Sequence, residues 1–119
     1  MGDNMFNFEK LRVYQDALIF IDIIYEITQS FPKQELFGIT TQLQRAAVSI
    51  SLNIAEGSSR TKKDFRHFLD ISRGSCYECA AIMTIAKKRR YISDTDYEVC
   101  YQHCTKLAKM ISALKASIK

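Results

Sequence analysis

Proline and glycine are scarce in this sequence, and long apolar runs are absent. One proline and four glycines occur in 119 residues, so we expect long elements joined by few turns. The longest strongly apolar stretch, 17–27, is interrupted by Asp22 and Glu26 and is shorter than the roughly 20 residues that a membrane-spanning helix needs. The N-terminus lacks the basic-then-apolar order of a signal peptide. We therefore expect a cytoplasmic protein with no membrane partner.

The composition predicts one folded domain. Hydrophobic residues make up 47% of the chain and charged residues 25%, which argues against disorder, and the length suits a single domain over residues 1–119. No segment has the pattern of a strand. Apolar residues recur instead at spacings of three and four, which is the helical period. The pattern predicts four helices, at about 8–30, 38–57, 62–91 and 94–118.

Local signals set the ends of these helices. Pro32 disfavours helix in the residue before it, and Gly57 is typical of a helix C-terminus. Thr61 and Ser93 each stand three residues before an aspartate, the spacing of an N-cap. Because short connections make neighbouring helices antiparallel, the sequence predicts an all-α fold, an antiparallel up-down-up-down four-helix bundle.

Apolar seams indicate which helix faces are buried. The fourth helix has one seam, which is enough to face a bundle core. Its members are Tyr97, Cys100, Cys104, Leu107, Ile111, Leu114 and Ile118. The second helix has a core face formed by Leu43, Ala47, Ile50 and Ile54.

The first predicted helix has two apolar seams. One consists of Leu11, Tyr14, Leu18, Ile21 and Tyr25, and we expect it to face the core. The other would then be a contiguous apolar strip in water, which usually marks an interface. We predict that this second seam contacts a second copy of the chain, through the candidate residues Val13, Ala17, Phe20, Ile24 and Ile27. The alternative is a helix buried unusually deeply in its own bundle.

The segment "RAAVSISLNIAEGSSR", residues 45–60, carries small and polar residues at helical spacing. Small side chains let a second helix approach, and the third helix has a matching small set near Ser75. We predict an ion pair between Arg45 and Glu78 that fixes the register of the two helices. We also expect a partner for Asn53 near the start of the third helix, and a surface pair of Glu56 with Arg60. The predicted structural polar motif comprises Arg45, Ser49, Asn53, Glu56, Ser75 and Glu78.

The four cysteines, Cys76, Cys79, Cys100 and Cys104, suggest a zinc site by their spacing. On two antiparallel helices, however, Cys76 and Cys100 would lie about ten residues, or roughly 15 Å, apart along the axis. One ion cannot gather four thiolates at that separation, since the Zn–S distance is about 2.3 Å. We predict buried reduced thiols that pack as small apolar side chains, and no metal ligand.

No residue pattern predicts catalysis. A di-iron bundle needs two Glu-x-x-His motifs, whereas Asp64 and His67 form only a near match, and Glu98 and His103 are five residues apart. Nucleophile elbows, phosphate-binding glycine loops and triad spacings are not found in the sequence. We therefore predict no catalytic residue, no cofactor and no enzymatic activity.

The chain has a formal net charge of +4, and its basic residues gather at two predicted turns. Such clusters attract phosphate backbones without reading sequence. The alternative is that they are solvated helix ends whose charge complements the helix dipole. The candidate nucleic-acid-binding residues are Arg60, Lys62, Lys63 and Arg66 at one turn and Lys87, Lys88, Arg89 and Arg90 at the other.

Three segments carry a family resemblance. They are "FEKLRVYQDAL", "FPKQELFGITTQLQRAAVSISLNIAEGSSR" and "FRHFLDISRGSCYECAAIM". Together they resemble the bacterial four-helix-bundle family that is encoded by intervening sequences in large-subunit ribosomal RNA genes and is often described as ribosomal-protein-like. That family is similar in turn to the accessory variability proteins of diversity-generating retroelements. Cys79 departs from the pattern, where a larger aliphatic residue is more typical.

The resemblance implies a homo-oligomer, a ring of five bundles, with a nucleic-acid partner and no catalysis. Two functional hypotheses follow. In the first, the protein is a basic oligomeric module that binds RNA or DNA. In the second, it is an adaptor or assembly scaffold whose ring docks a partner protein and whose positive charge is incidental.

Overall fold

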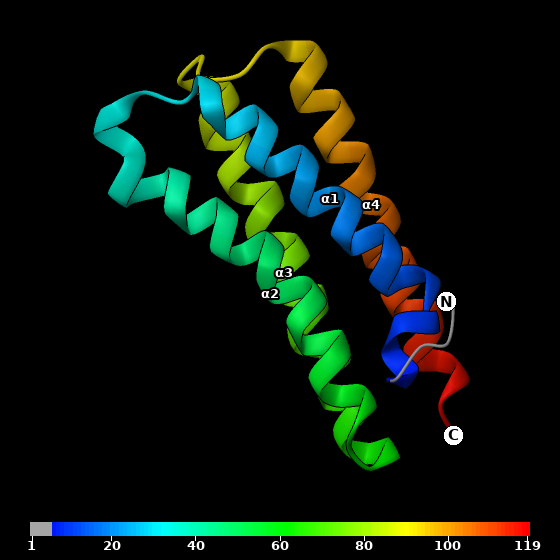
Figure 1. Ribbon diagram of the computed structural model, residues 1–119. Coiled ribbons are helices and arrows are strands. Elements are labelled where there is room, and N and C mark those ends of the chain that lie inside the picture. The colour runs from blue at the N-terminus through cyan, green and yellow to red at the C-terminus, as the bar shows by residue number, and fades with distance from the viewer. Residues whose placement is uncertain (1–5) are drawn as a thin grey trace, which may run out of the picture.

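The computed structural model describes residues 6–119, and these form an all-α bundle. The four long helices are α1 (Arg12–Ile27), α2 (Thr41–Ser58), α3 (Lys62–Lys88) and α4 (Asp94–Ser117). Successive helices run in opposite directions (Figure 1). Helices α1 and α3 each pack against α2 and α4, so they occupy opposite corners of the bundle. The predicted fold class is confirmed, and no strand occurs within the described residues.

The connection between α1 and α2 contains short irregular helices. Two 3₁₀ turns, Thr28–Ser30 and Lys33–Glu35, are followed by a π turn, Leu36–Thr40. Gly38 has a non-helical backbone (φ −114°, ψ −119°), and this is why α2 begins at Thr41 rather than near residue 38. The first predicted helix is also interrupted, because Leu11 is extended (φ −75°, ψ 127°) between a 3₁₀ turn, Asn7–Lys10, and α1.

Both predicted N-caps are confirmed. The backbone N–H of Asp64 donates to Oγ1 of Thr61 at 3.1 Å, and that of Asp96 donates to Oγ of Ser93 at 3.0 Å. Each bond satisfies a donor that the first helical turn leaves unpaired. Helices α3 and α4 therefore begin where the sequence predicts.

Helix α3 ends three residues before the predicted position because Arg90 has a left-handed backbone, with φ 63°. The N–H of Arg90 donates to the carbonyl of Lys87 at 3.0 Å, and that of Tyr91 donates to the carbonyl of Ala86 at 2.8 Å. These two bonds form the Schellman motif that closes many helices. The motif turns the chain sharply into α4.

Helix α2 ends at Ser58, one residue after the predicted Gly57, but Gly57 does not have the left-handed backbone of a C-terminal glycine. It lies inside α2 and is buried, and an ideal Cβ at this position would lie 2.6 Å from Cβ of Phe68. Such a distance is far below van der Waals contact, so only glycine lets α2 and α3 approach this closely. The small stripe of α2 thus acts as the sequence predicts at this point, although the role of Gly57 differs.

The core contains the seam of α1 that the sequence assigned to an interface, and Leu11, Tyr14 and Ile21 of the other seam pack against it partly buried. Four of the predicted interface residues are buried inside the single chain, with exposed fractions of 4% or less: Val13, Ala17, Phe20 and Ile24. The fifth, Ile27, is half-buried against this core. The prediction that this seam contacts a second copy is therefore wrong. A tyrosine suits the water edge of a helix because its hydroxyl can remain solvated, and both tyrosines of α1 belong to the other seam.

The remaining core matches the predicted seams. The core face of α2 is fully buried: Leu43, Ala47, Ile50 and Ile54. The central part of the α4 seam is buried as well: Cys100, Cys104, Leu107 and Ile111. Of the helices in residues 6–119, none combines the length and the hydropathy that crossing a membrane requires.

Candidate nucleic-acid interface and assembly surface

The basic cluster at the α2–α3 turn divides into structural and free residues. Arg60 Nη2 pairs with Glu56 at 2.6 Å, as predicted, and its guanidinium lies 5.4 Å from the ring centroid of Phe68. Arg66 donates from Nη1 to the carbonyls of Lys115 and Ile118, at 2.9 and 3.0 Å. Arg66 therefore caps the C-terminus of α4, where an orphan carbonyl and the negative end of the dipole favour a cation.

Lys62 and Lys63 of this cluster are free. Both are exposed on the first turn of α3, and neither takes part in an ion pair within the described residues. The two ammonium groups are therefore available to an external anion. Of the four residues predicted at this turn, these two fit a phosphate-binding role best.

The cluster at the α3–α4 turn is more open. Lys88, Arg89 and Arg90 are exposed, and within residues 6–119 they make no ion pair. Lys87 differs, because its ammonium lies 4.5 Å from the ring centroid of Tyr97, a cation–π contact. The α3–α4 turn lies at the opposite end of the bundle from the α2–α3 turn (Figure 1).

The polar motif forms a hydrogen-bonded junction between α2 and α3. The Ser49 hydroxyl accepts from Oγ of Ser75 at 2.9 Å and from Nδ2 of Asn53 at 2.9 Å. One turn of α3 earlier, Oγ of Ser72 donates to the carbonyl of Ile50 at 2.8 Å in a fully buried setting. These bonds tie the small faces of the two helices together and fix their register.

Two predicted partners in this motif are wrong. No ion pair joins Arg45 to Glu78 in the part of the chain that the structure describes; Glu78 instead accepts from Nε2 of Gln42 at 3.5 Å. Asn53 reaches back along its own helix to the carbonyl of Ser49 at 2.8 Å rather than to the start of α3. A helical amide can bond the turn before it, and this local bond needs no tertiary partner.

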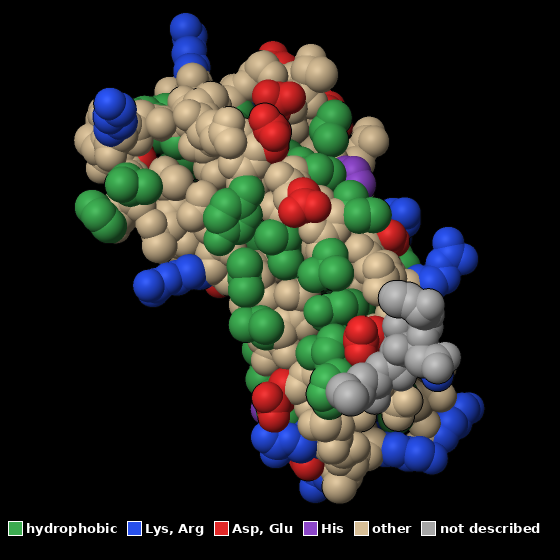
Figure 2. Space-filling view, in the orientation of Figure 1, with side chains coloured by type: hydrophobic (Ala, Val, Ile, Leu, Met, Phe, Trp, Pro, Cys, Tyr) green, Lys and Arg blue, Asp and Glu red, His purple; other side chains and the backbone are tan. Residues whose placement is uncertain are grey.

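The outward faces of α1 and α2 share an exposed apolar surface. Figure 2 shows hydrophobic side chains gathered over the middle of one face, with Lys and Arg mainly around its margins. Leu18 and Tyr25 of α1 are 38% and 46% exposed, and Leu52 of α2 is 60% exposed. Tyr25 and Leu52 line one hollow of about 690 Å³ together with Arg45 and Asn53. We call Leu18, Tyr25 and Leu52 the α1–α2 patch.

Leu52 was missed in the sequence, although a signal was present. It lies two residues from both Ile50 and Ile54, and on a helix that spacing places a side chain on the opposite side from its neighbours. A leucine out of phase with the core seam indicates an apolar side chain facing outward.

The four thiols are buried and unpaired, which confirms that they pack as core residues. Sγ of Cys104 donates to the carbonyl of Cys76 at 3.0 Å. A hydrogen bond with the Cys76 side chain, together with burial, raises the pKa of Cys104. Burial also raises the pKa of Cys79 and that of Cys100, the latter to about 11. In the described residues no three His, Cys, Asp or Glu side chains are grouped so that they could hold a metal ion.

Comparison with known proteins decides the family. The model of the 23S rRNA-intervening sequence protein family matches residues 9–113, which is nearly the whole chain. The chain belongs to this family. The matched region includes the α2–α3 junction and both basic turns.

A solved relative supports the same fold. A protein of unknown function from the S23 ribosomal protein family of Bacteroides thetaiotaomicron superposes with a TM-score of 0.81 at 22% sequence identity. The match covers 88% of this chain and 99% of that chain. At this identity the likeness establishes the fold alone. No curated protein matches the chain, and neither description names a reaction.

Proposed function

We propose that this family member is a non-enzymatic homo-oligomer, a ring of five chains, that binds RNA through its basic ends. The observation that carries the proposal is the set of exposed, unpaired cations at both ends of one bundle. The number five comes from the family resemblance, and the choice of RNA from the family's link to ribosomal RNA genes. No part of the proposal needs a cofactor.

The proposed RNA-contacting residues are fewer than the sequence predicts. Arg60, Arg66 and Lys87 are engaged within the chain. The exposed cations without an ion pair within residues 6–119 are Lys62 and Lys63 at one end and Lys88, Arg89 and Arg90 at the other. A ring repeats both sets around its rims, and at +4 per chain five chains carry 5 × 4 = +20. Such a surface concentrates phosphate backbones, and its affinity falls steeply with salt.

The assembly surface in this proposal is the α1–α2 patch, with a second copy as its occupant. Asp22 and Glu26 are exposed on α1, and Arg45 is exposed on α2; none of the three has an ion-pair partner within residues 6–119. One chain thus offers unpaired acids on one helix and an unpaired base on its neighbour, beside exposed apolar residues. A head-to-tail contact between copies pairs these charges and, repeated, closes a ring.

A binding titration with a matched pair of variants tests the RNA claim. We expect Lys88→Gln/Arg89→Gln to weaken binding to both RNA and duplex DNA, and to reduce the slope of log affinity against log salt by roughly 0.7–0.9 for each lost phosphate contact. The control Lys10→Gln/Arg12→Gln removes the same charge from exposed positions just before α1 and at its first residue and should have a smaller effect. Absence of binding by the wild-type protein at low salt, or equal effects of the two variants, would contradict the claim.

A second candidate function rests on the corner before α2. Phe37 is 93% exposed and Leu36 is 50% exposed, and an exposed apolar pair at a corner is a feature of protein-docking surfaces. In this alternative the ring is an adaptor for a partner protein. An assembled ring that binds neither RNA nor DNA at low salt would favour the adaptor over the RNA-binding module.

A further inference from the structure

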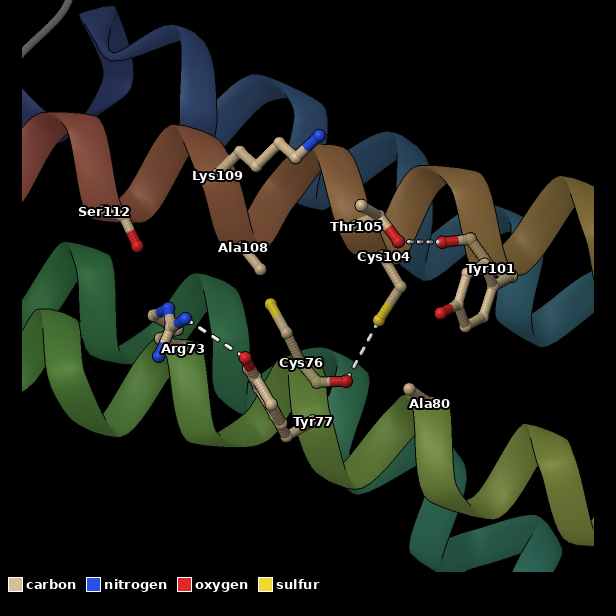
Figure 3. A pocket seen from close by; sticks show the side chains of 10 residues that line it. All are labelled: Arg73, Cys76, Tyr77, Ala80, Tyr101, Cys104, Thr105, Ala108, Lys109 and Ser112. Atoms are coloured by element: carbon tan, nitrogen blue, oxygen red, sulfur yellow. Dashed lines mark hydrogen bonds between the residues drawn. The ribbon is translucent and has the colours of Figure 1, made fainter.

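A groove lies between α3 and α4, with α2 and α1 behind it (Figure 3). It encloses about 450 Å³, which is within the range of pockets that bind small organic groups. Figure 3 shows the small side chains of Cys76, Ala80 and Ala108 pointing into the space between the two helices. Because these side chains are short, they leave a hollow with an apolar floor rather than a packed seam.

Two tyrosines and two cations surround this floor. Tyr77 is 60% exposed and Tyr101 is 45% exposed. Arg73 donates from Nη2 to the Tyr77 hydroxyl at 3.1 Å, and its guanidinium lies 5.0 Å from the ring centroid. Lys109 lines the groove from α4.

The charge of the groove is uncompensated. No Asp or Glu is among the residues that line it. Neither Arg73 nor Lys109 makes an ion pair in the described part of the chain. The groove therefore combines exposed aromatic faces with positive charge that no ion pair neutralises, which favours an occupant that is both flat and anionic.

The same combination continues toward the basic α3–α4 turn. The rings of Tyr101 and Tyr97 stack with centroids 5.8 Å apart and an interplanar angle of 26°. The Lys87 ammonium lies over the Tyr97 ring, and Lys88 follows it. A cation thus lies at each end of a set of tyrosine rings, Arg73 at one end and Lys87 at the other, 14 residues or about 21 Å of helix apart. Residues far apart in the sequence supply this arrangement, so the linear basic clusters do not reveal it.

We propose that this groove binds single-stranded RNA, with a base stacked against Tyr77 and Tyr101 and the flanking phosphates contacting Arg73 and Lys109. Proteins hold single strands by this combination of aromatic stacking and a cationic track. A duplex buries its base faces in its own stack and cannot use the aromatic walls. The inference rests on the proposed RNA binding and specifies the form of RNA that the α3–α4 face selects.

The test compares single-stranded and duplex RNA of one sequence, with 2-aminopurine in the single strand as a reporter of stacking. We expect Tyr77→Ala/Tyr101→Ala to weaken single-strand binding at least about fivefold and to abolish the stacking signal. Duplex affinity and the salt slope should stay unchanged, because no charge is removed. Tyr77→Phe/Tyr101→Phe keeps both rings and should bind as the wild type does. Phe37→Ala removes an exposed aromatic residue outside the groove and should have no effect.

The outcomes separate this inference from the proposed function. If Lys88→Gln/Arg89→Gln weakens RNA binding while Tyr77→Ala/Tyr101→Ala leaves single-strand affinity unchanged, the groove proposal is overturned and the proposed function survives. If Tyr77→Ala/Tyr101→Ala loses single-strand and duplex affinity equally, the proposed stacking of a base on these tyrosines is also overturned. If the wild-type protein binds no nucleic acid, both proposals fall.

Discussion

Single residues at the helix ends and junctions hold this bundle in its register. The caps Thr61 and Ser93 could be predicted because an N-cap depends on three or four consecutive residues. The partners of Arg45 and Asn53 could not, because they depend on how two whole helices rotate about their axes. A rotation of one residue position, about 100° on an α-helix, moves a side chain from a junction to the surface.

Arg90 provides the first prediction. Its left-handed backbone costs a residue with a Cβ roughly 1–2 kcal/mol, part of which glycine recovers. We expect Arg90→Gly to raise the free energy of unfolding by about 0.5–1 kcal/mol, measured by urea denaturation. The control is Arg89→Gly at the neighbouring position, where φ is −79° and glycine only adds unfolded-state entropy. An equal decrease in the free energy of unfolding of both variants would argue against a strained backbone at Arg90.

Gly57 and Gly74 form a matched pair for the second prediction. Both lie within helices, where alanine is favoured over glycine by about 1 kcal/mol. A methyl group added at Gly74 would have no neighbouring atom within 4 Å. Gly74→Ala should therefore stabilise the folded protein by about 1 kcal/mol. Gly57→Ala should destabilise by about 1–3 kcal/mol because the methyl meets Cβ of Phe68. Thermal unfolding of both variants distinguishes them, and stabilisation by Gly57→Ala would refute the close approach of α2 and α3.

At the scale of elements, the sequence predicts which positions are apolar better than it predicts which face is inside. The seam of α4 and the core face of α2 are confirmed because each helix has one apolar stripe and therefore one orientation. Helix α1 has two neighbouring apolar stripes, and periodicity alone does not tell which of them faces the core. The buried stripe contains Ala17 and the less buried stripe contains two tyrosines, so side-chain size and polarity carry the information that spacing lacks.

The buried thiols of α3 and α4 give the third prediction. In an unfolded chain a thiol ionises near pH 8.5, whereas burial raises the pKa of Cys100 in the folded protein to about 11. Between these values the folded state retains a proton that the unfolded state has lost. The free energy of unfolding should therefore fall as pH rises from about 8.5 to 11, by at most about 1.4 kcal/mol per pH unit for each such thiol.

The measurement is urea unfolding at pH 7.5, 8.5 and 9.5. Cys100→Ala should be less stable than the wild type at pH 7.5, because it leaves a small cavity, but its stability should decline less steeply with pH. If the stabilities of the two proteins decline in parallel with pH, burial does not raise the pKa of Cys100.

At the scale of the whole molecule, one narrow bundle carries free cations at both ends and an apolar patch between them. The clusters could be located in the sequence, but their division into free and engaged residues could not. Arg66 shows why, since its partners are carbonyls 49 and 52 residues away. Only the closed bundle brings the start of α3 beside the end of α4.

The fourth prediction concerns the α1–α2 patch. Leu52→Glu places a charge at the most exposed leucine of this patch and should separate the assembly into single chains while leaving the helical content unchanged, as measured by sedimentation and circular dichroism. Leu36→Glu makes the same change at a comparably exposed leucine outside the patch. It should leave the assembly intact. If both variants dissociate into single chains, the α1–α2 patch is not the specific assembly surface.

The mass of the wild-type protein in solution tests the central claim most directly. One chain has a mass of 13.7 kDa, so sedimentation equilibrium should give 5 × 13.7 = 68.5 kDa for the ring. A mass of 13.7 kDa at all protein concentrations would contradict the assembly and the multiplied charge that the proposed RNA binding depends on.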